Sequence, residues 1–528
     1  MAKTQPVVDH ASSRKNNPVV LAAACIAAVL LPTSITGTGV ALPSIAADIG
    51  GDIVQLQWVV HAYDLTFAAF MLALGSMSDI YGRRRMFRIG VTTYGICALA
   101  ASAASNLLFL DLVRGITGIA AAAVMTSAAA AIAQNFEGPA QARAFGLFGT
   151  SFGIGLAFGP MLAGGLSTAF GWRAFFLAQV VVAILALSCS KPLPGRPEAA
   201  TRNIDWPGAV AFVLCLFSFI LGLVEAPQRG LDDPYILALF GATVALAAAF
   251  VVIELRSSHP MFDLSLLKQK RYFAVCLAPI SLAFGFVALL VYLPTYLMTA
   301  HDLTAWNAGV YMMALTLPTL VMPGVAGALV ARGYSARWLM VVCMSLVAAG
   351  CFGMISIDSS SSLIATAFPL IVIGTGFGIS NGILDAAAAT SVAPERAGMA
   401  VGMFNTTRIA GEVVAIAVMG SLIVAYLRSA LSDTPIDQSA SLATDVPDVA
   451  NTIAEGSLRT ASEALEEPPR GDFLDWALDA FDHAMHWSYF WIGIVCALTV
   501  PFIAVFMREP DATSSSHQPQ PVDAPTPS

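Results

Sequence analysis

Five charged side chains lie inside long apolar stretches of the sequence, where a charge is costly and requires an explanation. They are Asp64, Arg114, Asp385, Arg408 and Glu412. Burial raises the pKa of a carboxyl group, and a neighbouring cation lowers it again. A buried acid can therefore bind a proton from one side of a membrane and release it on the other. These residue types predict proton binding that is coupled to the binding of a second charged species.

Asp64 lies about seven residues into its apolar stretch, on the half that we place toward the outer surface. In one interpretation it takes up the proton or binds a cationic compound. In the other it is a fixed partner of Arg114, or a carboxylate that reaches outward beside His61. Arg114 needs a partner because a guanidinium stays charged. Asp64 and Asp111, the latter one helical turn away, are the acids that we expect to supply it.

Asn405, Arg408 and Glu412 are spaced i, i+3 and i+7, so they share one face of a helix. This face predicts a polar cavity wall on which Glu412 binds a proton or a substrate. The alternative is that Arg408 and Glu412, one turn apart, only neutralise each other. Asp385 is nearer to the predicted cytoplasmic side, where it is either a proton exit or an acid that reaches toward the surface.

The elements that must position these residues are helices that span a membrane. Of the 528 residues, 57% are hydrophobic and only 11% are charged, whereas a soluble protein has about 25% charged residues. Runs of about 20 apolar residues recur along the chain, which indicates helices rather than barrel strands. The predicted fold class is all-α integral membrane, with fourteen spans near 19–42, 56–78, 86–105, 107–132, 143–167, 172–190, 207–224, 235–254, 273–298, 305–330, 337–357, 362–391, 400–427 and 488–507.

The distribution of basic residues predicts the orientation of the chain. Most of the 26 Lys and Arg residues fall in the tails and loops on the side of the N-terminus, so both termini are predicted to be cytoplasmic. Basic linkers follow the sixth and the eighth span, which suggests two repeated bundles joined by a helical pair. The predicted parts are a cytoplasmic tail 1–18, a six-helix bundle 19–190, a linker with two additional spans 191–272, a second six-helix bundle 273–507 and a disordered cytoplasmic tail 508–528.

The second bundle includes a long acidic loop, 428–487, on the outer side of the membrane. This loop accounts for most of the negative net charge of the chain, which is -8. Residues 472–486 carry apolar side chains at helical spacing, so we expect an amphipathic helix that leads into the last span.

Gly75, Asp79, Gly82 and Arg83 lie between the second and third spans, beside further arginines. We predict that Asp79 and these arginines form a charge lock between helices at the cytoplasmic face, which breaks and reforms as the helices move. The general preference of basic residues for cytoplasmic loops is the alternative. It would explain the arginines, but not Asp79 or the glycines.

The fifth span combines small residues with a proline: Gly153, Gly159, Pro160 and Gly164. Glycines allow helix backbones to approach closely, and proline removes a helix hydrogen bond. We predict a bent helix that seals the outer path. Ordinary small-residue packing is the alternative.

Four stretches carry a resemblance to a known family: Gln57–Tyr63, Gly75–Arg85, Leu110–Gly118 and Gly149–Gly165. Together they resemble the motifs of the major facilitator superfamily, specifically its 14-span drug:proton antiporters. The resemblance covers nearly the whole chain. It implies the major facilitator fold, a role for Arg114 in proton coupling, and proton-coupled export of amphipathic, cationic drugs or toxic compounds across the cytoplasmic (inner) membrane.

The chain departs from the pattern of that family at three places. Relatives carry an acid in the first span shortly before Ala41-Leu42-Pro43, and this chain has none there. Thr117 stands where a glutamine is expected, and Ile80 where a basic residue is usual. Asp64 is our candidate to replace the missing acid.

The residue content argues against enzymatic chemistry. There is no nucleotide-binding loop and no nucleophile constellation, and the eight cysteines lie in apolar segments without metal-ligand spacing. We therefore predict no catalytic residues, no cofactor and no metal. The expected partners are protons, a small-molecule substrate and the lipid bilayer, without nucleic acid, for a protein that is a monomer.

Two other functions fit the same residues. The protein could export a single metabolite or antibiotic, which only a substrate panel would separate from multidrug export. It could also be a membrane sensor or scaffold that has lost transport, which would leave the fifth-span motif unexplained. Some similar exporters work with a periplasmic adaptor protein. No residue calls for one here, and the loop 428–487 could clash with it.

Overall fold

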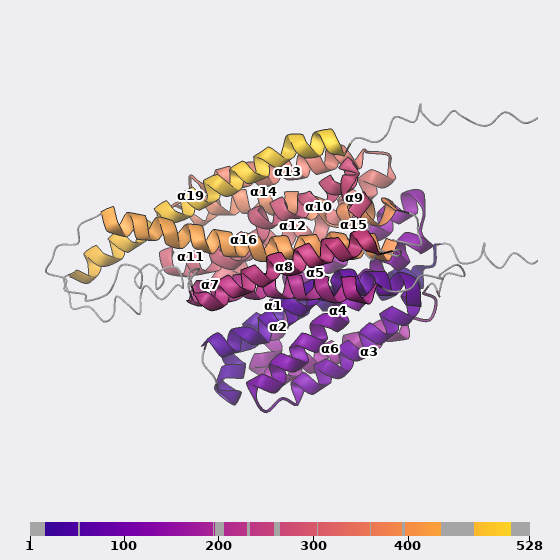
Figure 1. Ribbon diagram of the computed structural model, residues 1–528. Coiled ribbons are helices and arrows are strands. Elements are labelled where there is room, and N and C mark those ends of the chain that lie inside the picture. The colour runs from indigo at the N-terminus through magenta and orange to yellow at the C-terminus, as the bar shows by residue number, and fades with distance from the viewer. Residues whose placement is uncertain are drawn as a thin grey trace, which may run out of the picture.

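The computed structural model describes residues 16–50, 53–193, 195, 205–229, 233–257, 264–301, 303, 305–359, 361–392, 397–433 and 469–507. These residues form an all-helical bundle (Figure 1). The first half contains α1 (Pro18–Ile49), α2 (Ile53–Tyr81), α3 (Arg83–Ser102), α4 (Leu107–Asn135), α5 (Gly138–Phe170) and α6 (Trp172–Ser188). Next come α7 (Trp206–Arg229), α8 (Pro234–Arg256) and the short α9 (Leu264–Lys268).

The second half begins with α10 (Lys270–Leu282), a π-helical turn η2 (Ala283–Val287) and α11 (Ala288–Ala300), which together form one span. The remaining helices are α12 (Ala305–Ala331), α13 (Ala336–Met354), α14 (Leu363–Ser380), α15 (Ile383–Thr390), α16 (Ala397–Asp433) and α19 (Pro469–Phe506). Figure 1 shows α1 to α6 gathered on one side, α10 to α19 on the other, and α7 and α8 lying across the front.

The predicted all-α membrane fold is confirmed. Within the described part of the chain, twelve spans are long and apolar enough to cross a membrane. Two more predicted spans correspond to α3, which begins with three arginines, and to α6, which is a shorter apolar helix of 17 residues. Both pack inside the bundle through buried residues such as Tyr94 and Phe175, so all fourteen predicted spans have a helical counterpart. The division into domains stays a prediction.

The twelfth predicted span, 362–391, is interrupted. The helix breaks at Asn381–Gly382, where Gly382 has φ 83°, a left-handed conformation that favours glycine. A Cβ atom on Gly382 would lie 2.4 Å from the carbonyl oxygen of Phe145 in α5, so only glycine fits there. The break places Asp385 in the first turn of the new helix α15.

The last two helices are longer than the sequence analysis predicted. With 37 and 38 residues, α16 and α19 reach about 55 Å, well beyond the hydrocarbon thickness of about 30 Å. Figure 1 shows the two helices projecting together past the rest of the bundle. The predicted loop 428–487 is thus helical at both ends, and its residues 434–468 lie outside the described part of the chain.

The predicted amphipathic helix, 472–486, is the first part of α19. It continues without a break into the last span, and its apolar residues Ala477, Phe481, Ala484 and Met485 are buried against the second half. An apolar face of this kind lets a helix extend beyond the membrane, because a neighbouring helix covers it in place of lipid.

Asp482 ties this outer part of α19 to the bundle. Its Oδ1 accepts a 2.5 Å hydrogen bond from the hydroxyl of Tyr296 in α11. Its Oδ2 accepts bonds from the backbone N–H and the hydroxyl of Ser359, at 2.9 and 2.8 Å. The carboxylate is almost fully buried. Three donors from two other segments therefore depend on one side chain.

Replacing this carboxylate is expected to destabilise the protein. Asp482→Ala leaves the buried donors of Tyr296 and Ser359 without an acceptor, at about 1–3 kcal/mol for each unsatisfied group. We expect a melting temperature in detergent that is several degrees below that of the wild type. Asp479→Ala, an exposed acid one turn earlier, is the control and should melt as the wild type does. Equal melting of both variants would contradict the role of Asp482.

Candidate functional site

Asp79, at the end of α2 that we predict to be cytoplasmic, connects the two halves of the protein. Its Oδ1 lies 3.0 Å from the NH2 nitrogen of Arg83, one turn later at the start of α3. Oδ1 also accepts a 3.0 Å hydrogen bond from the backbone N–H of Gly398, and Oδ2 a 2.8 Å bond from that of Met399. These two amides belong to the first turn of α16, where backbone donors have no helical partner and attract negative charge. We call this arrangement the Asp79 latch.

Arg83 is held firmly in place. Only 1% of its surface is exposed, and besides Asp79 it donates a 2.5 Å hydrogen bond to the side chain of Gln134 in α4. Gly82, which precedes it, has φ 93° and makes the sharp turn between α2 and α3. The predicted charge lock thus has a geometric basis, although its opening and closing stay a prediction.

Glycines bring the two halves into direct contact on the same side as the Asp79 latch. A Cβ on Gly75 of α2 would lie 2.4 Å from the carbonyl oxygen of Gly398. A Cβ on Gly146 of α5 would lie 3.1 Å from the Cα of Gly327 in α12, so these backbones also touch. Together with the Asp79 latch, these contacts close this side of the interface between the halves.

The predicted small-residue motif of α5 contacts helices on both sides. A Cβ on Gly153 would lie 2.5 Å from the carbonyl oxygen of Thr319 in α12, and one on Gly159 would lie 2.4 Å from the hydroxyl of Thr36 in α1. Pro160 lies inside the helix, as the motif requires. Gly164 is less tightly packed, since its nearest contact would be at 3.5 Å. The predicted role of this motif in sealing the outer path stays a prediction.

Arg114 is fully enclosed in the first half, where its direct contacts are with other groups than the expected carboxylates, although the charges of Asp64 and Asp111 still act on it. Its Nε donates a 2.8 Å hydrogen bond to the carbonyl oxygen of Val59, and its NH1 a 2.7 Å bond to the hydroxyl of Ser34. The guanidinium also stacks 4.5 Å from the ring centre of Tyr63. Of the two acids expected to pair with it, Asp64 and Asp111, neither comes within 4.0 Å in the described structure. Carbonyl oxygens and an aromatic ring replace the carboxylate.

Arg408 lies between two acids in the second half. Its NH1 is 3.9 Å from Oδ2 of Asp385, and its Nε is 4.0 Å from Oε1 of Glu412. Its guanidinium also lies 5.3 Å from the ring centre of Phe152, which belongs to α5 of the first half. The predicted pairing of Arg408 with Glu412 is present, while binding of a proton or substrate by Glu412 stays a prediction. The Arg408–Glu412 pair exists, but it is long and is shared with a second acid.

A small cavity adjoins these residues. Asp385, Phe404, Arg408 and Glu412 line it, together with Asn381 at the break between α14 and α15. Oδ1 of Asp385 is buried without a hydrogen-bond partner in the described structure. Oδ1 of Asp385 is therefore a hydrogen-bond acceptor to which no group in the described structure donates.

Asn405 has a different surrounding from the one predicted. Its side chain is fully buried and donates a 3.0 Å hydrogen bond to the carbonyl oxygen of Val401. Its Oδ1 has no hydrogen-bond partner among the described residues, and it does not line the cavity beside Glu412. Asn405 thus packs within the helix interface instead of forming the cavity wall.

Asp64 links the two charged regions electrostatically. It lies on α2, which packs against α16, and it interacts with the charges of both Arg114 and Glu412. Asp385, Arg408 and Glu412 thus lie where the halves meet, and Asp64 connects them electrostatically to Arg114, which is enclosed in the first half. We call these five residues the interface charges.

Comparison with known proteins gives this arrangement a family. The sequence model of the Major Facilitator Superfamily matches residues 24–416, which is most of the chain. The chain belongs to the major facilitator superfamily. It is 30% identical to the multidrug resistance protein Stp of Mycobacterium tuberculosis, over 74% of this chain and 73% of that protein. It is 26% identical to the tetracenomycin C resistance and export protein of Streptomyces glaucescens, over 96% and 94% of the two chains.

A solved structure of the major facilitator superfamily has the same fold. The proton:xylose symporter XylE matches 93% of this chain with 95% of its own, at a TM-score of 0.57 and 13% sequence identity. At this identity the likeness concerns the fold alone. The protein is thus a multi-pass membrane transporter of the major facilitator superfamily, and its family resemblance in sequence is confirmed.

Several partners in this superfamily member were not found by sequence reasoning. Ser34 and Tyr63 hold Arg114, Gln134 holds Arg83, and Phe152 contacts Arg408 across the two halves. Ser34 could have been noticed as a polar residue in the first apolar stretch. Tyr63 ends one of the stretches that resemble the family, but its contact with Arg114 was not predicted, and Phe152 carried no signal, because the neighbours of an aromatic residue in a span depend on helix packing.

The enclosed position of Arg114 leads to a prediction. Arg114→Lys keeps the charge but cannot bond Val59 and Ser34 while also stacking on Tyr63. Each hydrogen bond to a charged group is worth about 1.5–3 kcal/mol, so we expect transport at least about tenfold slower. The measurement is the initial rate of dye export per amount of protein in the membrane. Arg256→Lys, at the exposed end of α8, is the control, and an unchanged rate for Arg114→Lys would contradict the prediction.

Proposed function

We propose that the protein is a proton-coupled antiporter that exports amphipathic cationic compounds across the cytoplasmic membrane, with both termini in the cytoplasm. The names of its relatives, a multidrug resistance protein and an antibiotic export protein, support export of toxic compounds. Proton coupling and the preference for cations are supported by the interface charges.

The observation that carries the proposal is the imbalance of the interface charges. The set has three carboxyl groups and two guanidinium groups, so one negative charge remains when all five residues are ionised. Asp111 also interacts with the charge of Arg114, but it is partly exposed and we leave it outside the set. An uncompensated charge inside a membrane is costly, and either one proton or one monovalent cation removes it. A bound proton neutralises the surplus charge and so disfavours binding of the cation, and a bound cation likewise disfavours binding of the proton. This competition is what an exchange of proton for substrate requires.

The closed cytoplasmic side gives the order of events. In the structure the Asp79 latch and the glycine contacts of Gly75 and Gly398 shut the path to the cytoplasm. In this state a proton from outside reaches Asp64 and the cation leaves. After the latch opens, Asp385, on the cytoplasmic side of the interface charges, passes the proton on while a new cation binds.

Everted membrane vesicles that contain the full chain test the proposal. With an acid interior, they are expected to accumulate a cationic dye such as ethidium, and nigericin, which collapses the pH gradient, should release it. Adding substrate should also make the interior less acid, as protons leave in exchange. Accumulation that survives nigericin would contradict proton coupling. Failure with every cation in a panel, against vesicles without the protein, would contradict the function.

A narrower function has one observation in its favour. The relative from Streptomyces glaucescens, which matches nearly the whole chain, is named for resistance to and export of one compound, tetracenomycin C. A panel of structurally unrelated cations in the same vesicles separates the two functions. A multidrug exporter transports several of them, and a dedicated exporter transports one class.

A further inference from the structure

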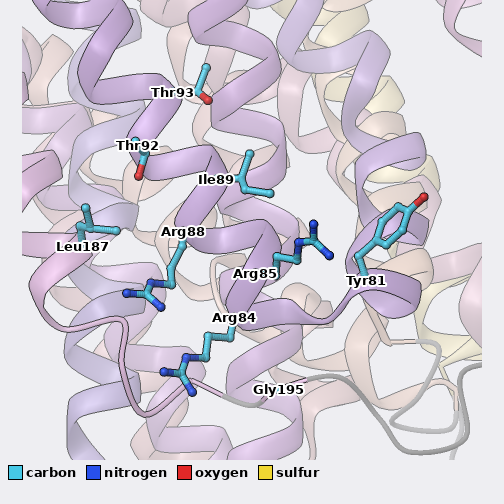
Figure 2. A pocket seen from close by; sticks show the side chains of 9 residues that line it. All are labelled: Tyr81, Arg84, Arg85, Arg88, Ile89, Thr92, Thr93, Leu187 and Gly195. Carbon is cyan, nitrogen blue, oxygen red and sulfur yellow. The ribbon is translucent and has the colours of Figure 1, made fainter.

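A groove at the cytoplasmic ends of α3 and α6 has no part in the proposed transport cycle. Its volume is about 910 Å³, and Arg84, Arg85 and Arg88 line its mouth. Ile89 and Thr92 of α3 and Leu187 at the end of α6 line the rest. Figure 2 shows the guanidinium group of Arg85 turned toward Tyr81 and those of Arg84 and Arg88 turned to the other side, with Thr92 and Thr93 farther along the same helix.

The three arginines have no internal task. In the described structure none of them forms a hydrogen bond, an ion pair or a ring contact, in contrast to the neighbouring Arg83 with its bonds to Asp79 and Gln134. Arg85 and Arg88 are exposed, and Arg84 is half-buried. The positive end of the dipole of α3 adds to their charge. The mouth of the groove is therefore strongly positive and its guanidinium groups are available.

Beyond the groove, the exposed surface of α3 is apolar. Ile96 and Leu99 follow Ile89 along α3 and are 62% and 53% exposed, and on α6, which packs against α3, Ile184 is 61% exposed. Arg88 is only five residues from the start of α3, about 7.5 Å along the helix axis, which is the depth of lipid headgroups rather than of acyl chains. Positive charge at headgroup depth is thus followed by an apolar track toward the bilayer centre.

We propose that this groove binds an anionic phospholipid of the cytoplasmic leaflet. The planar guanidinium groups of Arg84, Arg85 and Arg88 match the paired oxygens of its phosphate, as Arg does at phosphate sites in general. One acyl chain lies along Ile89 and Ile96 between α3 and α6. A soluble phosphate compound would use the arginines but not the apolar track, so the combination of the two favours a lipid.

The test compares lipid binding to the purified full chain in detergent by native mass spectrometry. We expect one tightly retained phosphatidylglycerol and at least tenfold weaker retention of phosphatidylcholine, whose headgroup has no net charge. The triple variant Arg84→Gln/Arg85→Gln/Arg88→Gln should bind phosphatidylglycerol at least about tenfold more weakly than the wild type, because each basic residue near an anionic lipid contributes to the attraction. The matched control removes the same charge elsewhere on the cytoplasmic side, with Arg256→Gln/Arg271→Gln/Arg332→Gln, and should bind as the wild type does.

Three results would overturn the proposal. They are equal weakening in the triple variant and its control, equal binding of the two lipids, and displacement of phosphatidylglycerol by millimolar inorganic phosphate, which would indicate a soluble anion instead. If the triple variant cannot be purified, the single variant Arg88→Gln replaces it in the test. Arg83, Arg84 and Arg85 then remain to determine the orientation of the chain in the membrane. The single variant is expected to weaken binding at least threefold, and unchanged binding would also overturn the proposal.

Discussion

Asp64→Asn and Glu412→Gln are each expected to lower proton-driven export of a cationic dye about 100-fold. Either substitution removes the surplus negative charge, so the interface charges become neutral before a proton or a cation binds. At about 6 Å and an effective dielectric constant of about 20, one charge pair is worth about 3 kcal/mol, which corresponds to that factor. Both substitutions preserve size and polarity, so the fold should be kept.

The measurement is the initial rate of dye uptake into everted vesicles with an acid interior. Asp479→Asn, an exposed acid on α19, is the matched control and should transport normally. Downhill movement of the dye without a pH gradient separates the two roles. An acid that binds only the proton can be lost without stopping this movement, whereas an acid that also binds the cation cannot. Normal uphill transport by both variants would contradict the assignment of the interface charges.

Gly398→Val is expected to slow transport strongly by disfavouring the closed contact between the halves at Gly75 and Gly398. A Cβ on Gly398 would lie 2.6 Å from Oδ1 of Asp79 and 2.6 Å from the carbonyl oxygen of Gly75, both too close for any real contact. The clash exists only when the halves are closed, so folding and membrane insertion should be normal. Overpacking costs about 1–3 kcal/mol, which lowers the closed population and the transport rate about 10- to 100-fold.

Two observations check this second prediction. The first is dye export per amount of protein, compared with Gly309→Val, whose Cβ would meet nothing within 4 Å. The second is the labelling of a cysteine introduced on the cytoplasmic side of the interface, which should become faster in Gly398→Val and stay slow in the control. Wild-type export and slow labelling in Gly398→Val would show that the contact between Gly75 and Gly398 is not needed for closure.

Hydropathy was sufficient to predict which segments form helices, because every backbone group in a lipid environment must be bonded within its own segment. This is why α3 was found despite its three arginines, and why Asp64 and Glu412 stood out. What hydropathy cannot predict is how the helices face each other. Arg114 was assigned a carboxylate partner, yet it is satisfied by a carbonyl oxygen, a hydroxyl and an aromatic ring on neighbouring helices.

The same limit explains the other differences. The partners of Asp79 are backbone amides of Gly398 and Met399, and every residue except proline has such an amide, so no side-chain pattern marks them. The break at Gly382 follows from the approach of Phe145 in another helix, and a lone glycine in an apolar run does not reveal it. The length of α19 depends on its contacts outside the membrane, where the hydropathy signal ends.

The helix α16 has a mechanical consequence. It runs from Ala397 to Asp433 without an internal proline, so it behaves as one stiff rod. The Asp79 latch holds one end, Arg408 and Glu412 lie along its shaft, and the other end projects outside the membrane. A tilt of about 5° about one end displaces the other by about 5 Å over a length of about 55 Å. A fluorescent probe on the outer tip should therefore report the opening of a latch on the opposite side of the membrane.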